Sequence, residues 1–554
     1  MFKIIKTLKQ YSFKEKSTIA SYLVLRTIKV AISVLMPLIS AKVITNLLEE
    51  EIKQTMQTVL VLCIFYAVGL FASHATKVSE NKLIRLIHYN VQKDLTTKVF
   101  AIPPSQLSIA QGRLISLILH DSSAISTLLL TFISAIFSVV TVLGIGVVVF
   151  QMNWKLSLIL LCMYPVNIAI NLFYGKRLKE CAGSYFEKKD EYISSLKNAI
   201  GNKIDISICG GEQAICDKLD EHNMGVYQSS LLQGRVKANY ATSMSGMSLI
   251  NHLLLTVIGI VFVYSGYIEF GDFVAFNSYS KSLTSAIDLI INLNSIMQPG
   301  IVSVERLNQL EAQYESSMKL EQAKQPLAST VQLIEFDNVS FSNKEKSILR
   351  NVSIRFQAGE IIGIWGENAS GKTTLANLLL SNLLPSCGRI YLNGFANDTL
   401  SYKSINHHIS YVGTSSNLFD ISVRDNLLIS CDAIPDDVEI DNICKVLNLE
   451  QDIDCLPQKF DTILSENVKL SSGQIQKIKL ARALLSKPDV LVLDEAFSNL
   501  DINVKSKTKS YLQRLRQEGK IILFISHDPD DYDICDRIYS IEGGTVNPLP
   551  CQSK

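Results

Sequence analysis

Charged residues are scarce in this chain. They make up 19% of its 554 residues, against roughly 25% in a typical soluble protein. Hydrophobic residues make up 47%, and the mean hydropathy is +0.22. The 53 Lys and Arg residues nearly balance the 52 Asp and Glu residues, so the net charge is +1 and there is no bulk attraction to polyanions. This composition argues against a disordered or collagen-like chain, and we expect no nucleic-acid partner.

The sequence also lacks paired cysteines and a cleavable secretion signal. Its 11 cysteines are scattered and none forms a Cys-x-x-Cys pair, so the spacing indicates neither a zinc site nor a disulfide framework. Met1–Lys16 contains five lysines and one glutamate, but no short apolar core followed by a small-residue cleavage site. We therefore expect reduced thiols and soluble parts that face a reducing compartment.

The apolar residues are concentrated in the first 300 positions. A helix of about 20 predominantly apolar residues spans a bilayer. Four windows contain no Asp, Glu, Lys or Arg, and we expect each to form a membrane helix. These windows are Gln54–Thr76, Ser122–Trp154, Leu156–Gly175 and Ala238–Ile268.

Two further windows are apolar but interrupted by charges. One covers Thr18–Leu47 and the other Phe273–Val304, and for each the alternative is an amphipathic helix on the membrane surface. The loops alternate between long, lysine-containing segments and short segments, two of them acidic. This alternation fits the positive-inside rule with six spans and both termini in the cytoplasm.

Charged side chains inside these two windows are candidates for a substrate cavity. A charge within the bilayer costs roughly 2.5–3.5 kcal/mol on insertion scales, so such groups usually face a protein-lined space. The candidates are Arg26, Lys29, Lys281 and Asp288. For Arg26 and Lys29 an equal alternative is that their long side chains reach the cytoplasmic interface.

The character of the sequence changes after residue 304. The segment 305–330 continues a helical pattern and then becomes a polar run with Pro326, which predicts a linker. From residue 331, short continuous apolar runs alternate with helical segments, a pattern typical of a parallel sheet covered on both faces. We therefore predict an all-α six-helix transmembrane domain over 1–304 with long cytoplasmic helical loops, followed by an α/β domain over 331–554.

A glycine-rich loop follows the apolar run Ile361–Ile364. It matches the phosphate-binding pattern GxxxxGK[ST] in its required place, after a strand and before a helix. Its glycines let backbone N–H groups surround a phosphate, and the helix N-terminus adds partial positive charge. Lys372 can reach the β- and γ-phosphates of a nucleoside triphosphate, and the Thr373 hydroxyl can ligate Mg²⁺. The expected nucleotide-binding residues here are Gly366, Glu367, Asn368, Ala369, Ser370, Gly371, Lys372, Thr373 and Thr374.

Two later strands end in residues suited to Mg²⁺ binding and catalysis. Val490–Leu493 leads to Asp494, which would hold Mg²⁺, and Glu495, which would activate or position the attacking water. Ile521–Ile525 leads to His527, and the ends of neighbouring parallel strands meet at one edge of a sheet. We therefore expect a P-loop ATPase domain in which His527 contacts the γ-phosphate. The alternatives are a solvent-facing acidic pair and a structural histidine.

A pentapeptide between the phosphate loop and Asp494 carries a family resemblance. Leu470-Ser471-Ser472-Gly473-Gln474 is close to the LSGGQ signature of ATP-binding-cassette (ABC) transporters, with Ser472 in place of a glycine. The chain resembles an exporter-type half-transporter (type IV), with the membrane domain and the cassette on one polypeptide. Ser498–Asp501 resembles the family's D-loop, His527 its switch histidine, and Glu466 an acidic position before the signature.

The membrane half is similar to that family as well. Tyr267–Phe273 resembles the turn before the sixth exporter helix, and Ser105–Leu114 and Ile204–Gln213 fall where the family places its coupling helices. The resemblance implies ATP-driven export, with ATP and Mg²⁺ bound by the cassette. The substrate class stays open between a peptide, a drug-like amphiphile and a lipid. Because the first span begins near Thr18, we expect no peptidase domain ahead of it.

The resemblance implies that the working unit is a dimer, since one chain carries one cassette. In the family, ATP lies between the phosphate loop of one cassette and the signature of the other. ATP binding and hydrolysis then drive alternating access. We expect a homodimer in the cytoplasmic (inner) membrane, and a heterodimer is the alternative. The signature residues that would reach the nucleotide are Ser471, Gly473 and Gln474.

Two positions besides Ser472 depart from the family pattern. Asn343 stands where exporters place an aromatic residue against adenine; Phe341 is a substitute or a core residue. A lost base–aromatic stack is worth roughly 1–3 kcal/mol by analogy with nucleic acids. Thr414 stands where the family has the Q-loop glutamine, and Asn417 is the nearest amide. Thr414 is the one support for a rival interpretation, a membrane-embedded nucleotide sensor or regulatory subunit that does not pump.

Overall fold

The computed structural model describes residues 16–109, 111–343, 346–413, 416–464, 468 and 470–549. Within these ranges the chain divides into two compact units. The first contains the residues up to Thr97 and those from Gln111 to Gln309, and it is helical throughout its regular structure. The second contains Lys98–Ile109 and the residues from Leu310 onward, and it holds every strand that the described ranges contain.

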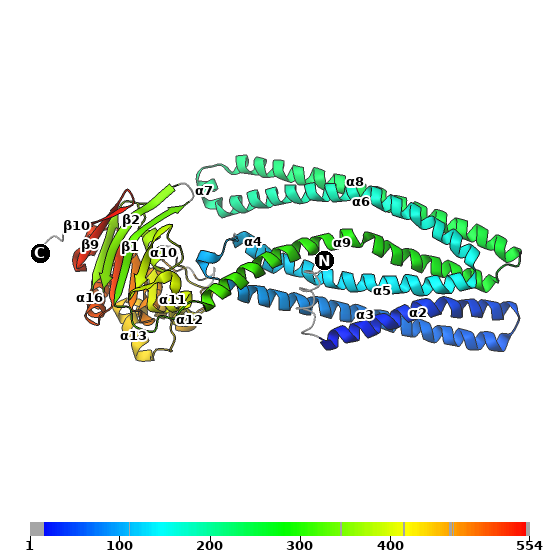
Figure 1. Cartoon of the computed structure of the whole chain (residues 1–554), viewed down its shortest axis with the longest axis horizontal. Helices are drawn as coiled ribbons and strands as arrows, with labels where there is room; N and C mark the ends of the chain where they lie inside the picture. The colour runs from blue at the N-terminus through cyan, green and yellow to red at the C-terminus, as the bar shows by residue number, and fades with distance from the viewer. Residues whose placement is uncertain are drawn as a thin grey trace. The chain divides into compact units, whose positions relative to one another are not determined.

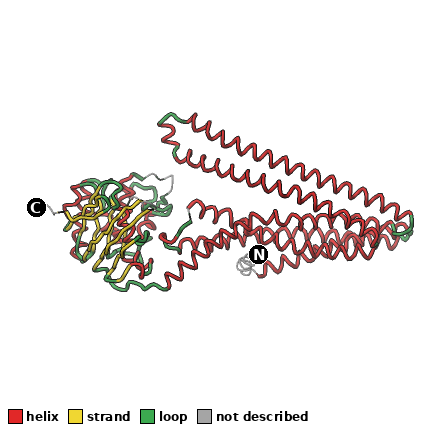
Figure 2. The backbone as a smooth tube through the Cα atoms, turned by 45° about the horizontal axis from the view of Figure 1, so that its top comes forward, coloured by secondary structure: helices red, strands yellow, loops and turns green. Residues whose placement is uncertain are grey.

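Six long helices pass through the first unit (Figure 1). Helices α6 and α8 pack along each other and are joined by the short α7 (Lys203–Ile208). Figure 2 shows this pair diverging from the other helices toward its α7 end. The short α4 (Gln111–Ser116) and a π-helical turn (Leu117–Asp121) lead into α5. The long helices are α2 (Lys16–Leu48), α3 (Ile52–Ala101), α5 (Ser122–Met152), α6 (Trp154–Gly201), α8 (Glu212–Tyr264) and α9 (Phe270–Gln322).

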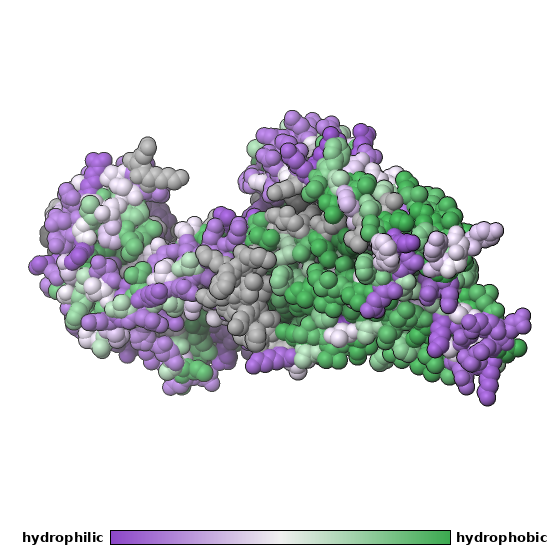
Figure 3. Space-filling view, turned by 45° about the vertical axis from the view of Figure 1, so that its right-hand side comes forward, coloured by the Kyte–Doolittle hydropathy of each residue, from purple (hydrophilic) through white to green (hydrophobic). Residues whose placement is uncertain are grey.

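Five helical stretches in the described ranges are long and apolar enough to cross a membrane: α2, α3, Gly112–Met152, α6 and α8. They include all or nearly all of the four uncharged windows and the whole of the first charged one. Figure 3 shows hydrophobic residues gathered over the surface of these helices. Large apolar side chains such as Leu70 and Phe71 are exposed there, and extensive exposed apolar surface is typical of contact with a membrane. This confirms a helical transmembrane domain.

Helix α9 carries the sixth expected span, but it is not among those five stretches of the described ranges. Its first half nevertheless lies in the core of the helical unit, where Phe276 and Tyr279 are buried against residues of α2, α5 and α8. Gly271 permits a close approach to α2, since a Cβ there would lie 2.5 Å from the Ala41 carbonyl oxygen. The sixth span therefore stays a prediction, which this packing supports.

The expected linker, 305–330, consists of the end of helix α9 followed by a segment without regular structure. Helix α9 continues to Gln322, and the polar run that follows has an extended backbone attached to the second unit. Leu327 is buried there, and its backbone N–H donates to Ser404 Oγ at 2.7 Å. The Val331 N–H donates to Asp489 Oδ2 at 3.1 Å. The domain limits 1–304 and 331–554 remain predictions.

The second unit is built on two sheets. The larger has the order β10-β9-β3-β8-β7-β6 and is parallel except for β10 at its edge. The smaller is antiparallel, in the order β2-β1-β4-β5. The strands of the larger sheet are β3 (Ile361–Gly366), β6 (Ile409–Val412), β7 (Val490–Asp494), β8 (Ile521–Ile525), β9 (Arg537–Glu542) and β10 (Thr545–Leu549). Those of the smaller sheet are β1 (Leu333–Asn343), β2 (Lys346–Gln357), β4 (Cys387–Leu392) and β5 (Phe395–Ala396).

Helices bury both faces of the parallel sheet. One apolar core joins the sheets to α10 (Lys372–Leu379) and α11 (Tyr402–His408), and a second joins the parallel sheet to the remaining helices. Every residue of β7 and β8 is buried, as their continuous apolar runs predict. The expected α/β fold is confirmed. The remaining helices are α12 (Val423–Leu428), α13 (Asp437–Val446), α14 (Leu449–Asp454), α15 (Ser472–Leu485), α16 (Ile502–Gln517) and the 3₁₀ turn η6 (Pro529–Ile534).

The central strand β8 allows a stability test. The Phe524 ring is buried and packs edge-on against Phe497, with ring centroids 4.9 Å apart. We expect Phe524→Ala to destabilise the cassette by about 3–5 kcal/mol, because it removes apolar contacts and leaves a cavity. Thermal unfolding of the full-length chain in detergent measures this as a lower midpoint. Phe395→Ala, at an exposed site on β5, is the control, and equal midpoints for the two variants would contradict this packing.

Candidate functional site

The phosphate loop connects β3 to α10, and its backbone requires glycine at both ends. Gly371 has a φ of +113°, and a Cβ there would lie 2.9 Å from Leu349 Cδ2. A Cβ on Gly366 would lie 2.8 Å from the Ile541 carbonyl oxygen. Such contacts are too close for a side chain, so only glycine fits at these two positions. Between them Glu367, Asn368 and Ala369 form an exposed tip.

Donors gather on the inner side of this loop. Lys372 is 6% exposed, and its ammonium donates to the carbonyls of Gly366 at 2.6 Å and Glu367 at 2.9 Å. The Ser370 hydroxyl is buried and has no hydrogen-bond partner in the described residues. A cation and an unpaired hydroxyl beside a helix N-terminus suit an anion such as a phosphate. The half-buried Thr374 follows in the first turn of α10.

Hydroxyl and carboxylate oxygens meet beside the loop. Asp494, at the end of β7, is 2% exposed, and its Oδ2 accepts hydrogen bonds from Thr373 Oγ1 at 2.8 Å and from the Tyr411 hydroxyl at 3.1 Å. Burial raises the pKa of Asp494 above its usual value, although the bonds from Thr373 and Tyr411 oppose the shift. An all-oxygen set beside a phosphate site fits Mg²⁺, which prefers hard oxygen ligands.

Glu495 and His527 lie together at the same edge of the sheet. Glu495 has a φ of +55°, and its N–H donates to the Ile525 carbonyl at 2.8 Å, which ties the end of β7 to the end of β8. Its Oε1 lies 3.5 Å from His527 Nδ1. The His527 side chain is 61% exposed, against 28% for Glu495. Both groups are therefore accessible to solvent at this edge of the sheet.

The signature segment begins helix α15. Ser471 caps the helix in a reciprocal arrangement with Gln474: Ser471 Oγ accepts from the Gln474 N–H, and Gln474 Oε1 accepts from the Ser471 N–H. A Cβ on Gly473 would lie 2.9 Å from the Asn499 carbonyl oxygen, so the signature packs closely on the Ser498–Asp501 segment. No hydrogen bond or ion pair joins these signature residues to the phosphate loop of the same chain within the described ranges.

The departures from the family pattern lie at the surface where the structure describes them. Asn343 is exposed at the end of β1, whereas Phe341 packs against the apolar core, as its alternative interpretation predicts. Ser472 is exposed in the first turn of α15. Asn417 is exposed, and its carbonyl accepts from Arg482 Nη1 at 3.2 Å. Thr414 and Glu466 lie outside the described residues.

The four charged residues of the membrane half are divided between two helices. Arg26 and Lys29 lie on α2, and Lys281 and Asp288 lie on α9, which approaches α2 at Gly271. Lys29 and Lys281 are exposed, and Arg26 and Asp288 are half-buried. Their role in a substrate cavity stays a prediction.

Tyr411 is the residue at the site that the sequence did not indicate. It lies in β6, and its hydroxyl reaches Asp494 because β6 pairs with β7 in parallel register. A tyrosine inside a short apolar strand gives no sign of this contact. Its position three residues before Thr414 was the one available signal.

Two family models match the chain. One, described as ABC transporter, matches residues 349–498, which contain the phosphate loop, the signature and Glu495. The other, described as ABC transporter transmembrane region, matches residues 19–287, from α2 into α9. Together they cover both units in the order that the sequence predicts.

Individual relatives are more distant. The chain is 27% identical over 500 residues to an ATP-dependent lipid A-core flippase of Desulfotalea psychrophila, covering 88% of this chain and 85% of that protein. It is 26% identical over 441 residues to the lactococcin-G-processing and transport ATP-binding protein LagD of Lactococcus lactis, covering 78% of this chain and 62% of LagD.

A solved structure shares the fold. The structure of a bacterial Atm1-family ABC exporter with ATP bound superposes with a TM-score of 0.82 at 18% identity, over 96% of this chain and 94% of that one. This agreement confirms the expected order of membrane helices and cassette. With both family models matched in one polypeptide, the chain belongs to the ABC transporters as an exporter-type half-transporter, in which ATP hydrolysis by the cassette is coupled to transport across the membrane.

Proposed function

We propose that two copies of this chain form a dimeric exporter in the cytoplasmic membrane, with both termini in the cytoplasm. The observation that carries the proposal is the separation of two half-sites on one cassette. The phosphate loop, Asp494, Glu495 and His527 lie at one edge of the parallel sheet, whereas the signature begins α15 with Ser471 and Ser472 exposed. Each half-site would be completed by the other cassette, which closes the dimer around two ATP molecules.

The residues of the first half-site have distinct tasks in this proposal. Lys372 and Ser370 would bind the phosphates, and the N-terminal turn of α10 would add backbone donors. Thr373 and Asp494 would hold Mg²⁺, which when bound neutralises charge on the β- and γ-phosphate oxygens. Both oxygens already lie in place, 2.8 Å apart.

Hydrolysis requires a positioned water and a sensor of the γ-phosphate. Glu495 would accept the proton of the attacking water, since its carboxylate lies beside Asp494 and is partly accessible. His527 would contact the γ-phosphate, and its separation of 3.5 Å from Glu495 supports a shared role at one reacting centre. From the partner cassette, Ser471, Gly473 and Gln474 would close over the same phosphate.

A heterodimer is the alternative assembly, because Asn343, Thr414 and Ser472 each depart from the family pattern. Purification of the full-length chain alone separates the two. A dimer that hydrolyses ATP by itself supports the homodimer, whereas an inactive chain that gains activity with a second half-transporter supports the heterodimer.

The transported substrate is a peptide, an amphipathic drug-like molecule or a lipid. One relative is named for lipid A-core and another for lactococcin G, which supports the lipid and peptide classes. Candidate compounds of each class should be screened in liposomes that contain the full-length chain, with ATPase stimulation and movement of the compound both measured. ATP binding without stimulation or movement for any class would instead favour a nucleotide sensor.

Replacement of the proposed base separates binding from hydrolysis. We expect Glu495→Gln to lower ATP turnover about 10²–10⁴-fold and to leave ATP affinity unchanged, because the amide cannot accept the water proton. Phosphate release and equilibrium binding of ATP measure the two effects. Glu542→Gln, at an exposed position at the end of β9 in the same sheet, is the control. Full turnover in Glu495→Gln would remove Glu495 from this role.

Replacement of Lys372 should affect ATP binding, whereas replacement of Glu495 should affect hydrolysis. We expect Lys372→Ala to weaken ATP binding itself, because it removes a buried cation that faces the phosphate site. Equilibrium binding of a fluorescent ATP analogue to the full-length chain measures the loss. Unchanged affinity would place the phosphates elsewhere.

The Tyr411 hydroxyl gives a test of the metal site. We expect Tyr411→Phe to weaken divalent-cation binding to the ATP-bound chain about 2–10-fold, because its hydrogen bond stabilises the ionised form of Asp494 and holds it in place. Mn²⁺ titration followed by electron paramagnetic resonance measures this directly. ATP binding in EDTA should not change, and Tyr391→Phe on β4 is the matched control. An equal Mn²⁺ affinity in both variants would contradict the role.

A further inference from the structure

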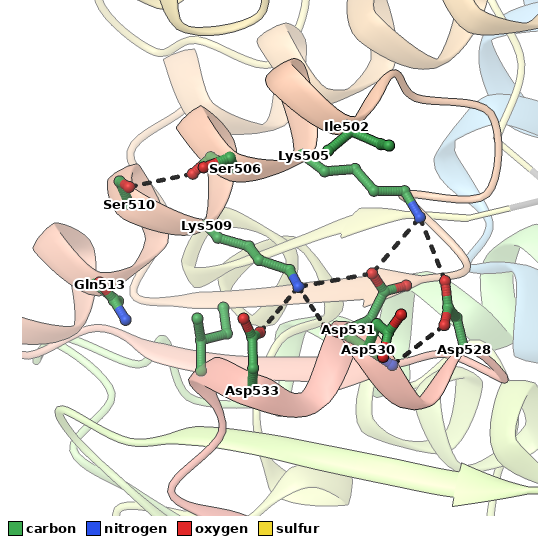
Figure 4. Close-up of a pocket in the computed structure, with 11 residues that line it drawn as sticks. Ile502, Lys505, Ser506, Lys509, Ser510, Gln513, Asp528, Asp530, Asp531 and Asp533 are labelled. Atoms are coloured by element: carbon green, nitrogen blue, oxygen red, sulfur yellow. Dashed lines mark hydrogen bonds and ion pairs between the residues drawn. The ribbon is translucent and has the colours of Figure 1, made fainter. Parts of the chain in front are cut away.

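The segment directly after His527 is the short turn η6, which faces helix α16 across a groove of about 460 Å³ (Figure 4). Figure 4 shows Lys505 and Lys509 of α16 reaching toward aspartates of this segment. The two elements follow the two loops that the sequence singles out, since α16 begins after Ser498–Asp501 and η6 begins after His527. The contacts across the groove therefore join the segments that follow Ser498–Asp501 and His527.

Ser526, the residue before His527, has each of its polar groups held by this turn. Its hydroxyl donates to Asp531 Oδ2 at 2.9 Å and accepts from the Asp528 N–H at 3.1 Å. Its own N–H donates to the Tyr532 hydroxyl at 3.0 Å, and its carbonyl also contacts that hydroxyl. The backbone on both sides of His527 is thus fixed by Ser526.

Tyr532 connects this arrangement to the strand that leads into the phosphate loop. Its hydroxyl lies 2.8 Å from the Ile364 carbonyl oxygen on β3. Its ring covers Gly363, where a Cβ would lie 2.5 Å from the ring. The Tyr532 hydroxyl lies between the carbonyls of Ile364 and Ser526 and can donate its proton to only one of them at a time. Its position nevertheless connects β3 to the end of β8.

Asp531 is the buried charge at the centre of the arrangement. It is 2% exposed, and its Oδ1 has no hydrogen-bond partner among the described residues. The nearest cations are Lys505 at 3.6 Å and Lys509 at 3.9 Å, both from α16. Lys505 also lies 3.5 Å from Asp528 Oδ2. A buried carboxylate needs such compensation, so α16 supplies the charge that keeps Asp531 against Ser526.

We propose that Asp531 is a positioning residue that orients His527 toward the γ-phosphate of ATP, acting through the hydroxyl of Ser526. The proposal rests on the proposed function, in which His527 contacts that phosphate. Through Lys505 and Lys509, the same carboxylate links the His527 segment to the helix that follows Ser498–Asp501. Asp531 touches no reacting atom, and its effect passes entirely through His527.

A double-mutant cycle with His527 tests this role in the full-length chain in liposomes, with ATP and Mg²⁺ as the probe. We expect Asp531→Ala and Ser526→Ala each to lower kcat about tenfold, in line with the loss of a hydrogen bond to a charged group, while KM for ATP stays constant. In a His527→Ala background, neither substitution should lower kcat further. Asp530→Ala is the matched control, because only backbone atoms of Asp530 enter the contacts that the structure shows.

The measurements distinguish a positioning role of Asp531 from a merely structural one. Equal losses in the wild-type and His527→Ala backgrounds would show a merely structural role and overturn the proposal, as would full activity of Ser526→Ala. If Asp531→Ala does not fold, Ser526→Ala decides alone, because it removes one hydroxyl and leaves the ion pairs intact. Full turnover of His527→Ala itself would instead overturn the role of His527 in the proposed function.

Discussion

A buried carboxylate at the end of an apolar strand is the constraint on which the site depends. Asp494 is removed from water, and the cost of burying its charge has to be offset by donors at fixed positions. The protein provides two hydroxyls, from Thr373 on α10 and Tyr411 on β6, and the charge of Lys372 acts in the same direction, yet burial still raises the pKa of Asp494. The compensation is therefore incomplete in the protein alone. A carboxylate left in this condition beside a phosphate loop favours a ligand that brings positive charge.

Asp531 provides a contrast within the same unit. It is as deeply buried as Asp494, but two lysines of α16 lie within 4 Å of its second oxygen. Its charge is compensated internally, so it has no need of a ligand and instead holds the backbone before His527. The two carboxylates thus illustrate how the same energetic problem produces a binding group in one place and a positioning group in another. The two sites differ in the cations nearby, because α16 brings two lysines within 4 Å of Asp531.

The local parts of the fold and of the site could be predicted from the sequence. The phosphate loop and the strands ending at Asp494 and near His527 depend on neighbouring residues, which the sequence displays directly. Parallel pairing of β3, β8 and β7 then brings the strand ends together.

The contacts that the sequence did not reveal are tertiary. Tyr411 meets Asp494 across 83 positions, and Tyr532 meets Ile364 across 168. Neither contact produces a periodic or local pattern in the sequence, because each depends on which elements become neighbours in the folded chain. Helix α9 illustrates the converse: Lys281 and Asp288 interrupt its apolar sequence, although its first half is buried in the helical core.

The glycine replaced by Ser472 bears on the choice between homodimer and heterodimer. Of the two central signature positions, Gly473 cannot accept a side chain, since a Cβ would meet the Asn499 carbonyl, whereas Ser472 is exposed in the first turn of α15 and meets no such obstacle. The Ser472 side chain is therefore accommodated within one cassette. Any cost arises only when another surface covers Ser472, and the same holds for the exposed Asn343. The departures that the structure describes thus lie at exposed positions of the cassette, so their effect is best measured in the proposed dimer with ATP bound.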